Sequence, residues 1–162
     1  MRLAPLIALL LVTLISAAFA DDAPSRERSL RIHLGGATLA GAPEYLTVDD
    51  LERLPQRESR IYDPYMKEEI LYRGVPLDEL IARYASPETA RVQIRAIDDY
   101  MAEFLRPEWK EDIFLLALRM NGERMGRAQS GPAKIVLQKK DPWNQHVQKW
   151  IWMIDRIDFS LQ

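Results

Sequence analysis

DIFLLALRMNGERMGRAQSGPAKIVLQ, residues 112–138, carries the strongest fold signal in the chain. A continuous apolar run reaches Asn121-Gly122, and a second apolar run, AKIV, closes the stretch. An Asn-Gly step after an apolar run predicts a β-hairpin, because both residues tolerate the positive φ angles of a type I′ turn. Between the two runs lies a concentration of hydrogen-bonding groups that raises the question of a ligand: Arg124, Arg127, Gln129, Ser130 and the Gly131-Pro132 step.

The segments before this stretch predict a strand and two short helices. In LRIHL (residues 30–34), apolar and polar residues alternate, which is typical of a half-buried strand. Thr47, with Asp50 three residues on, opens a short helix that Pro55 stops. Pro76 opens a second helix, whose buried stripe is predicted to be Leu77, Leu80, Ile81 and Tyr84.

Further strands are predicted on either side of the hairpin. ARVQIRAI (residues 90–97) alternates with period two and ends at Asp98-Asp99-Tyr100, at a sheet edge or pocket rim. KWIWMIDRIDFSL (residues 149–161) changes register along its length, which indicates a bulge or bend around Asp155-Arg156. These patterns predict an α+β domain of mostly mixed β-sheet with a few short helices.

The first twenty residues resemble a targeting segment rather than part of the fold. Residues 1–20 form an uncharged apolar run after Arg2 and end in Ala18-Phe19-Ala20, which is typical of a cleaved signal peptide. Residues 21–29 are polar and read as a flexible lead-in, so residues 30–162 are predicted to form a single domain. We therefore expect export, with a periplasmic location.

Composition excludes several classes of function. Without residues 1–20, the chain holds 21 basic and 24 acidic side chains, an interspersed balance that gives no footprint for nucleic acid. Cysteine is absent, which excludes a thiolate nucleophile and a sulfur ligand for a metal. His33 and His146 are the only histidines, too few for a histidine metal site, and no G-x-S-x-G elbow accompanies them.

Aromatic residues gather in two segments. Trp143, Trp150 and Trp152 lie within ten residues, and Tyr62, Tyr65 and Tyr72 lie in IYDPYMKEEILY (residues 61–72). For Trp150 and Trp152, packing in the core is the alternative to a role in ligand binding. Trp143 follows Asp141-Pro142 in a polar loop, where it could stack on a planar ligand or contact a partner.

The order of these motifs resembles a known family. Residues 112–138, followed by QKW (residues 148–150), are similar to the molybdopterin-binding domain of the sulfite oxidase family, in which D-x-LLA-x-x-MNG-x-x-L-x-x-x-x-G-x-P-x-R-x-V precedes VKW. ILYRGVPLDELI (residues 70–81) resembles the family's W-x-GV-x-L-x-x-LL segment, and ARVQIRAIDDY (residues 90–100) resembles its strand ending in DGY. The resemblance covers roughly residues 44–160 and implies the fold of that domain.

Two departures from the family change the functional expectation. The enzymes carry a cysteine that ligates molybdenum between the first helix and the GV-x-L segment, whereas the matching QRESRIYDPYMKEE (residues 56–69) has none. The enzymes also place a histidine just before the Gly of their G-x-P step, where this chain has Gln129-Ser130. The resemblance therefore implies that pterin recognition is kept and that the metal centre is lost.

The predicted function is a non-catalytic, periplasmic pterin-binding protein that signals to a membrane sensor. The resemblance implies a pterin without molybdenum as the ligand, and the periplasmic domain of a histidine kinase or a cyclic-dinucleotide enzyme as the partner. A molybdopterin-dependent oxidoreductase or its accessory subunit is the alternative, and a pure interaction module stays open. The ligand-binding residues predicted are Asp98, Tyr100, Arg127, Gln129, Ser130, Gly131, Trp143, Lys149 and Trp150.

Overall fold

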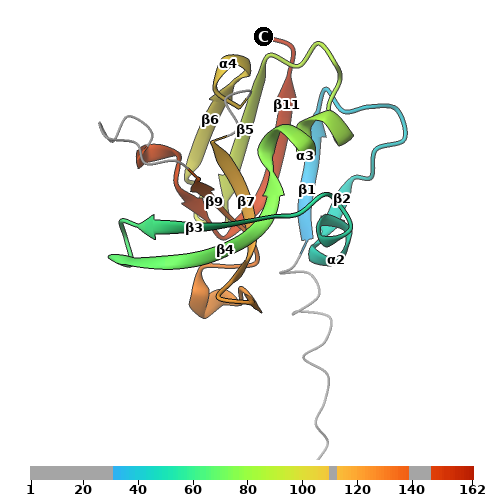
Figure 1. Ribbon diagram of the computed structural model, residues 1–162. Helices are drawn as coiled ribbons and strands as arrows, with labels where there is room; N and C mark the ends of the chain where they lie inside the picture. Colours follow the sequence, from blue (N-terminus) through green and yellow to red (C-terminus); the bar gives the residue numbers. More distant parts are fainter. Residues whose placement is uncertain (1–30, 110–112, 139–146) are drawn as a thin grey trace, which may run out of the picture.

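The computed structural model describes residues 31–109, 113–138 and 147–162, which form two β-sheets packed face to face (Figure 1). The first sheet has five strands in the order β2-β1-β11-β5-β6. β1 and β11 pair in parallel, and the other pairs are antiparallel. Its strands are β1 (Arg31–Gly36), β2 (Tyr45–Thr47), β5 (Arg91–Ala96), β6 (Met101–Leu105) and β11 (Ile154–Ser160).

The second sheet has six strands in the order β10-β9-β7-β4-β3, with β8 paired to β7. All its pairs are antiparallel, and β3 and β4 run across the direction of β1, β5 and β11 (Figure 1). The strands are β3 (Arg57–Asp63), β4 (Glu68–Pro76), β7 (Phe114–Met120), β8 (Glu123–Arg124), β9 (Lys134–Leu137) and β10 (Ile151–Trp152).

The hairpin predicted at Asn121-Gly122 joins β7 to β8. Both turn residues have positive φ, 51° and 89°, as a type I′ turn requires. Residues Phe114–Leu118 are all buried, which explains why the sequence of β7 is continuously apolar rather than alternating. The ring of Phe114 meets that of Phe104 edge to face at 4.9 Å, so β7 packs directly against β6 of the other sheet.

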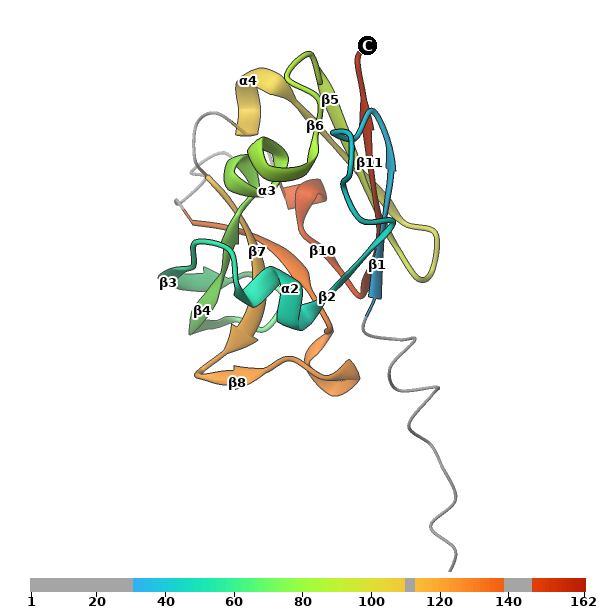
Figure 2. The same ribbon diagram turned by 90° about the vertical axis from the view of Figure 1, so that its right-hand side faces the viewer.

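Short helices close the ends of the sheets (Figure 2). α2 (Val48–Glu52) has the predicted capping box between Thr47 and Asp50. α3 (Leu77–Tyr84) buries the predicted stripe of Leu77, Leu80, Ile81 and Tyr84. None of the helices in the described ranges is long and apolar enough to cross a lipid bilayer. The remaining helical segments are α4 (Arg106–Trp109) and the 3₁₀ turns η1 (Arg127–Gln129) and η2 (Val147–Lys149).

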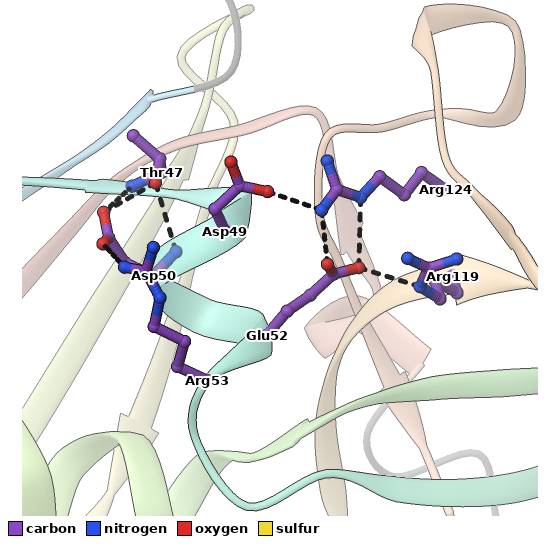
Figure 3. A network of polar contacts seen from close by, with 7 residues as sticks. All are labelled: Thr47, Asp49, Asp50, Glu52, Arg53, Arg119 and Arg124. Atoms are coloured by element: carbon purple, nitrogen blue, oxygen red, sulfur yellow. Dashed lines mark hydrogen bonds and ion pairs between the residues drawn. The ribbon is translucent and has the colours of Figure 1, made fainter.

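Charged side chains fix α2 to the β7–β8 hairpin (Figure 3). Glu52 accepts hydrogen bonds from Arg119 at 2.8 Å and from Arg124 at 2.5 Å, and Arg124 also pairs with Asp49 at 2.5 Å. The hydrogen bond from Arg124 is the main reason why the pKa of Glu52 lies below its usual value. Arg124, one of the donors noted in the sequence, is therefore occupied in holding a five-residue helix in place.

The C-terminal segment is more sharply divided than its sequence predicts. Met153 adopts φ = 53° and separates β10 from β11, which belong to different sheets. The predicted irregularity at Asp155 is also present, as a register shift between Ile154 and Arg156 in the pairing of β11 with β5. The sequence thus located the bulge but missed the strand's division between two sheets.

Candidate functional site

A cavity of about 220 Å³ lies where loops of both sheets meet β10. The β3–β4 turn contributes Tyr65, and the β5–β6 turn contributes Asp98 and Tyr100. Four aromatic side chains and one carboxylate make up most of the wall. The full lining is Tyr65, Ala96, Asp98, Tyr100, Trp150, Ile151 and Trp152.

The aromatic rings of this cavity support one another. The Tyr65 ring meets the rings of Trp152 at 5.1 Å and Trp150 at 6.0 Å, in both cases edge to face. Such pairs add about 0.5–1.5 kcal/mol beyond the area that they bury. Because Trp150 is only 5% exposed while Tyr65 is 49% exposed, the cavity runs from the core to the surface.

Two tyrosine hydroxyl groups hold η2 beside the cavity. Tyr65 donates to the carbonyl of Val147 at 3.1 Å, and Tyr100 donates to the carbonyl of Gln148 at 2.6 Å. Tyr65 belongs to the turn of one sheet and Tyr100 to the turn of the other. The segment that leads into Trp150 is thereby tied to both sheets.

A buried ionic cluster lies beneath the tryptophans. Lys134 Nζ is 2.5 Å from Asp63 Oδ2, and both side chains are almost fully buried, at 4% and 0% exposed. Tyr72 donates to the same carboxylate at 2.7 Å. The Lys134 ammonium also lies 5.2 Å from the centre of the Trp150 ring and 5.9 Å from that of Trp152, within range of a cation–π interaction.

The Asp63 carboxylate is fully engaged by hydrogen bonds. Its Oδ1 accepts from the amides of Tyr65 and Met66 at 2.8 and 3.0 Å, which shapes the turn that carries Tyr65. Burial alone would raise the pKa of Asp63, but the bonds from Lys134, Tyr72 and the Met66 amide hold that pKa below its usual range. The charged form therefore persists in the core, where it orders one wall of the cavity.

No local pattern in the sequence predicts this cluster. Its signals were a lone lysine, Lys134, inside the apolar run AKIV, and an aspartate, Asp63, beside the aromatic segment. Tyr65 and Trp152 were noted as aromatic but were not placed in the site, although both line the cavity. Asp63 and Lys134 lie 71 residues apart, so only the tertiary structure reveals the pair.

Three of the predicted site residues come together in the cavity, namely Asp98, Tyr100 and Trp150. Asp98 Oδ1 accepts from the Tyr100 amide at 3.2 Å, which orients the carboxylate at the exposed end of the cavity. Lys149 lies next to the cavity rather than in its lining. It forms a close ion pair with Glu108 and covers the ring of Phe104 at 5.3 Å, so its charge is already compensated.

Four further predicted residues lie in the turn around η1 and outside the described lining of the cavity, namely Arg127, Gln129, Ser130 and Gly131. Gln129 accepts from the Gly126 amide at 3.1 Å, and Ser130 has φ = 65°. A Cβ atom on Gly131 would lie 2.0 Å from the Met125 carbonyl oxygen. Arg127 is exposed at the surface. The turn thus has clear structural roles, and it meets the cavity region through the Ser130 carbonyl, which accepts from the Met153 amide at 3.0 Å.

Trp143, predicted as a ligand-binding residue, and His146 lie outside the described residues. His33 lies on β1 in the five-stranded sheet, half-buried with its ring edge to face with Tyr45 at 5.2 Å. Within residues 31–109, 113–138 and 147–162, no three acidic or histidine side chains gather closely enough to hold a metal ion.

The fold and the cavity define an α+β, two-sheet domain with one ligand-sized aromatic cavity at the junction of its sheets. The chain belongs to the oxidoreductase molybdopterin binding domain family, whose model matches residues 63–161. The sulfite oxidase-like fold expected from the sequence motifs is therefore confirmed.

A solved structure shows the same fold. The sulfane dehydrogenase SoxCD from Paracoccus pantotrophus aligns with a TM-score of 0.61 and 19% sequence identity, over 84% of this chain. The alignment spans 39% of the SoxCD chain, so the likeness concerns one part of a larger protein. A comparison with curated protein sequences gives no match.

The residues of the cavity fit only part of the cofactor that the family name implies. A molybdenum cofactor combines a flat pterin with a sulfur-bound metal and a phosphate, and these last parts are anionic. Among the described residues that line the cavity, Asp98 is the only one with a charged side chain, and the nearby Lys149 is paired with Glu108. The chain has no cysteine, and the part of the wall that the structure describes suits an uncharged flat ring and holds no group for the metal or the phosphate.

Proposed function

We propose that this protein is a non-catalytic binding protein for a flat heteroaromatic ligand such as a pterin. The observation that carries the proposal is the combination of four aromatic side chains with the single carboxylate of Asp98 in a cavity of about 220 Å³. A pterin needs a face on which to stack and an acceptor for its amino-pyrimidine edge. Trp150, Trp152 and the two tyrosines supply the first, and Asp98 supplies the second.

Fluorescence titration tests this proposal directly, because two tryptophans line the cavity. Oxidised and reduced pterins are added to the purified protein, and tryptophan emission is recorded. We expect saturable quenching with a Kd in the range of about 1–50 µM, which corresponds to a binding free energy of roughly −6 to −8 kcal/mol. Absence of binding at these concentrations by the folded protein would overturn the proposal.

A matched pair of variants assigns the binding to the carboxylate. Asp98→Asn keeps the shape of the side chain and its acceptor for the Tyr100 amide, but removes the charge that faces the ligand. Its neighbour Asp99 is 88% exposed and is outside the lining, so Asp99→Asn serves as the control. We expect affinity to fall about tenfold or more in the first variant and to stay unchanged in the second.

The proposal includes export and a membrane partner, both of which rest on the sequence. Residues 1–20 are expected to be removed by signal peptidase after Ala20, and mass spectrometry of the exported protein tests this. The partner would be the periplasmic domain of a histidine kinase or a cyclic-dinucleotide enzyme. Association of the two purified proteins that depends on ligand supports this role, and association that ignores the ligand counts against it.

Family membership favours a second candidate, a molybdopterin-dependent oxidoreductase or its accessory subunit. Metal analysis of the protein isolated from its native host distinguishes the two. Stoichiometric molybdenum with releasable cofactor supports the second candidate, whereas a bound pterin without molybdenum supports the first.

A further inference from the structure

β3 forms an open edge of the six-stranded sheet. Its one partner among the described strands is β4, and the two strands form the hairpin that extends to one side of the molecule (Figure 1). An edge strand presents a row of N–H and C=O groups that can pair with a further strand. The outer edge of β3 can therefore receive a strand of another chain.

The pairing of β4 shows which backbone groups of β3 point to this edge. The Leu71 amide donates to the side chain of Asn121 at 3.1 Å, and the Leu71 carbonyl accepts from the Asn121 amide at 2.8 Å, so Leu71 faces β7. The backbone groups of successive strand residues point to opposite sides, so Tyr72 faces β3, where it lies opposite Ser59. The residues on either side of Ser59 therefore turn their N–H and C=O groups away from β4.

The other edge strands are shorter or blocked. β2 has three residues, and β8 and β10 have two each. On β6, the Leu105 amide donates to the Glu108 carboxylate at 2.7 Å, and the Tyr100 hydroxyl holds η2 beside the strand. With seven residues, β3 is the longest edge strand in the described part of the chain.

The side chains along this edge alternate in charge. Glu58 and Arg60 are both exposed, and Ser59 lies between them. When a second copy of β3 pairs antiparallel about a two-fold axis at Ser59, Glu58 of each copy lies opposite Arg60 of the other. Each of these two pairs exchanges backbone hydrogen bonds and brings opposite charges together, which stabilises a cross-strand pair. A two-fold axis at Arg60 would instead place two arginines opposite each other.

We propose that the protein forms a two-fold symmetric dimer in which the β3 strands of two copies pair antiparallel, with Ser59 opposite Ser59. The two six-stranded sheets then become one continuous sheet. A single contact closes both edges, so assembly stops at the dimer. The dimer does not depend on the ligand proposed above, because no residue of β3 is in the described lining of the aromatic cavity.

Sedimentation of charge variants tests the dimer. We expect the wild type at about 200 µM to have twice the monomer mass, because pairing over a short edge gives a Kd of roughly 1–100 µM. Glu58→Arg and Arg60→Glu each place like charges opposite one another, and each should raise this Kd by about tenfold or more. An equal mixture of the two variants should restore the dimer, because every facing pair then joins an arginine to a glutamate.

Arg73→Glu is the matched control for these variants. Arg73 lies on β4 opposite Glu58 of the same chain, so reversing its charge disturbs the same part of the hairpin away from the second copy. This variant should have the wild-type mass. The proposal is wrong if the wild type is monomeric at the concentration tested, if the single variants stay dimeric, if their mixture stays monomeric, or if Arg73→Glu also loses the dimer.

A single introduced cysteine tests the register, because the chain has none of its own. The backbone of Ser59 faces β4, so Ser59 and its copy form a non-hydrogen-bonded pair whose Cα atoms lie about 4.5 Å apart, within reach of a disulfide. We expect Ser59→Cys to give a disulfide-linked dimer on mild oxidation. Tyr62→Cys, exposed on the same strand, would lie roughly 20 Å from its copy and should stay unlinked. Equal cross-linking of both variants, or none with Ser59→Cys, would overturn this pairing.

Discussion

The Asp63–Lys134 pair is buried more deeply than almost any other charged group in the described chain. Both oxygens of the Asp63 carboxylate accept hydrogen bonds. Removing one partner of such a pair leaves an uncompensated charge in the core, which typically costs about 3–5 kcal/mol. We therefore expect Lys134→Met to lower the free energy of unfolding by about that amount in urea titrations. The double variant Asp63→Asn/Lys134→Met should recover part of the loss. A cost below about 1 kcal/mol for the single variant would contradict this reading.

The same carboxylate makes stability depend on pH in a defined direction. Burial disfavours the charged form of Asp63, but the bonds from Lys134, Tyr72 and the Met66 amide prevail and lower its pKa in the folded state. Its stabilising contribution is therefore complete above the unfolded pKa, about 4, and is lost as the pH falls through the lower folded value. Urea midpoints measured between pH 6 and pH 2.5 should fall more steeply in the wild type than in Asp63→Asn. Parallel curves would show that this group does not contribute.

Among the elements, the pairing of β4 with β7 depends on one glycine. At Gly74 the register shifts, and a Cβ atom would lie 2.0 Å from the Leu116 carbonyl oxygen. Because that atom belongs to the backbone of a buried strand, Gly74→Ala must displace β7, at a cost of about 3 kcal/mol or more. Gly126→Ala is the control, since its Cβ would meet only the end of the Gln129 side chain at 3.2 Å. Similar unfolding midpoints for the two variants would refute the argument.

At the scale of the whole molecule, the sequence predicts the structural features that depend on residues close together in the chain. The capping box at Thr47, the hairpin at Asn121-Gly122 and the stripe of α3 follow from neighbouring residues, and all three are present. β3 was missed because Glu58 and Arg60 are charged and exposed, and its first buried apolar residue is Ile61. The family motifs supplied the overall fold, which periodicity alone did not fix.

The site was harder to predict than the fold because it is built from distant segments. The sequence treated the donors around η1 and the residues near Tyr100 as one site, but only the latter line the aromatic cavity. Asp98 lies in the β5–β6 turn of one sheet and Trp150 directly precedes β10 of the other, and the cluster beneath them joins β3, β4 and β9. Such contacts have no signature in local spacing.

This construction predicts how a ligand would act on the whole molecule. Tyr65 comes from the turn of one sheet and Asp98 from the turn of the other, so a ligand between them connects the two sheets. At about 100 times its Kd, such a ligand stabilises the folded state by about 2.7 kcal/mol. We expect hydrogen exchange at the amides of Tyr65, Met66 and Tyr100 to slow together on addition of a pterin, and Asp98→Asn to reduce the stabilisation and the slowing together at the same ligand concentration. Protection confined to one turn would mean that the ligand contacts one sheet alone and does not fill the cavity.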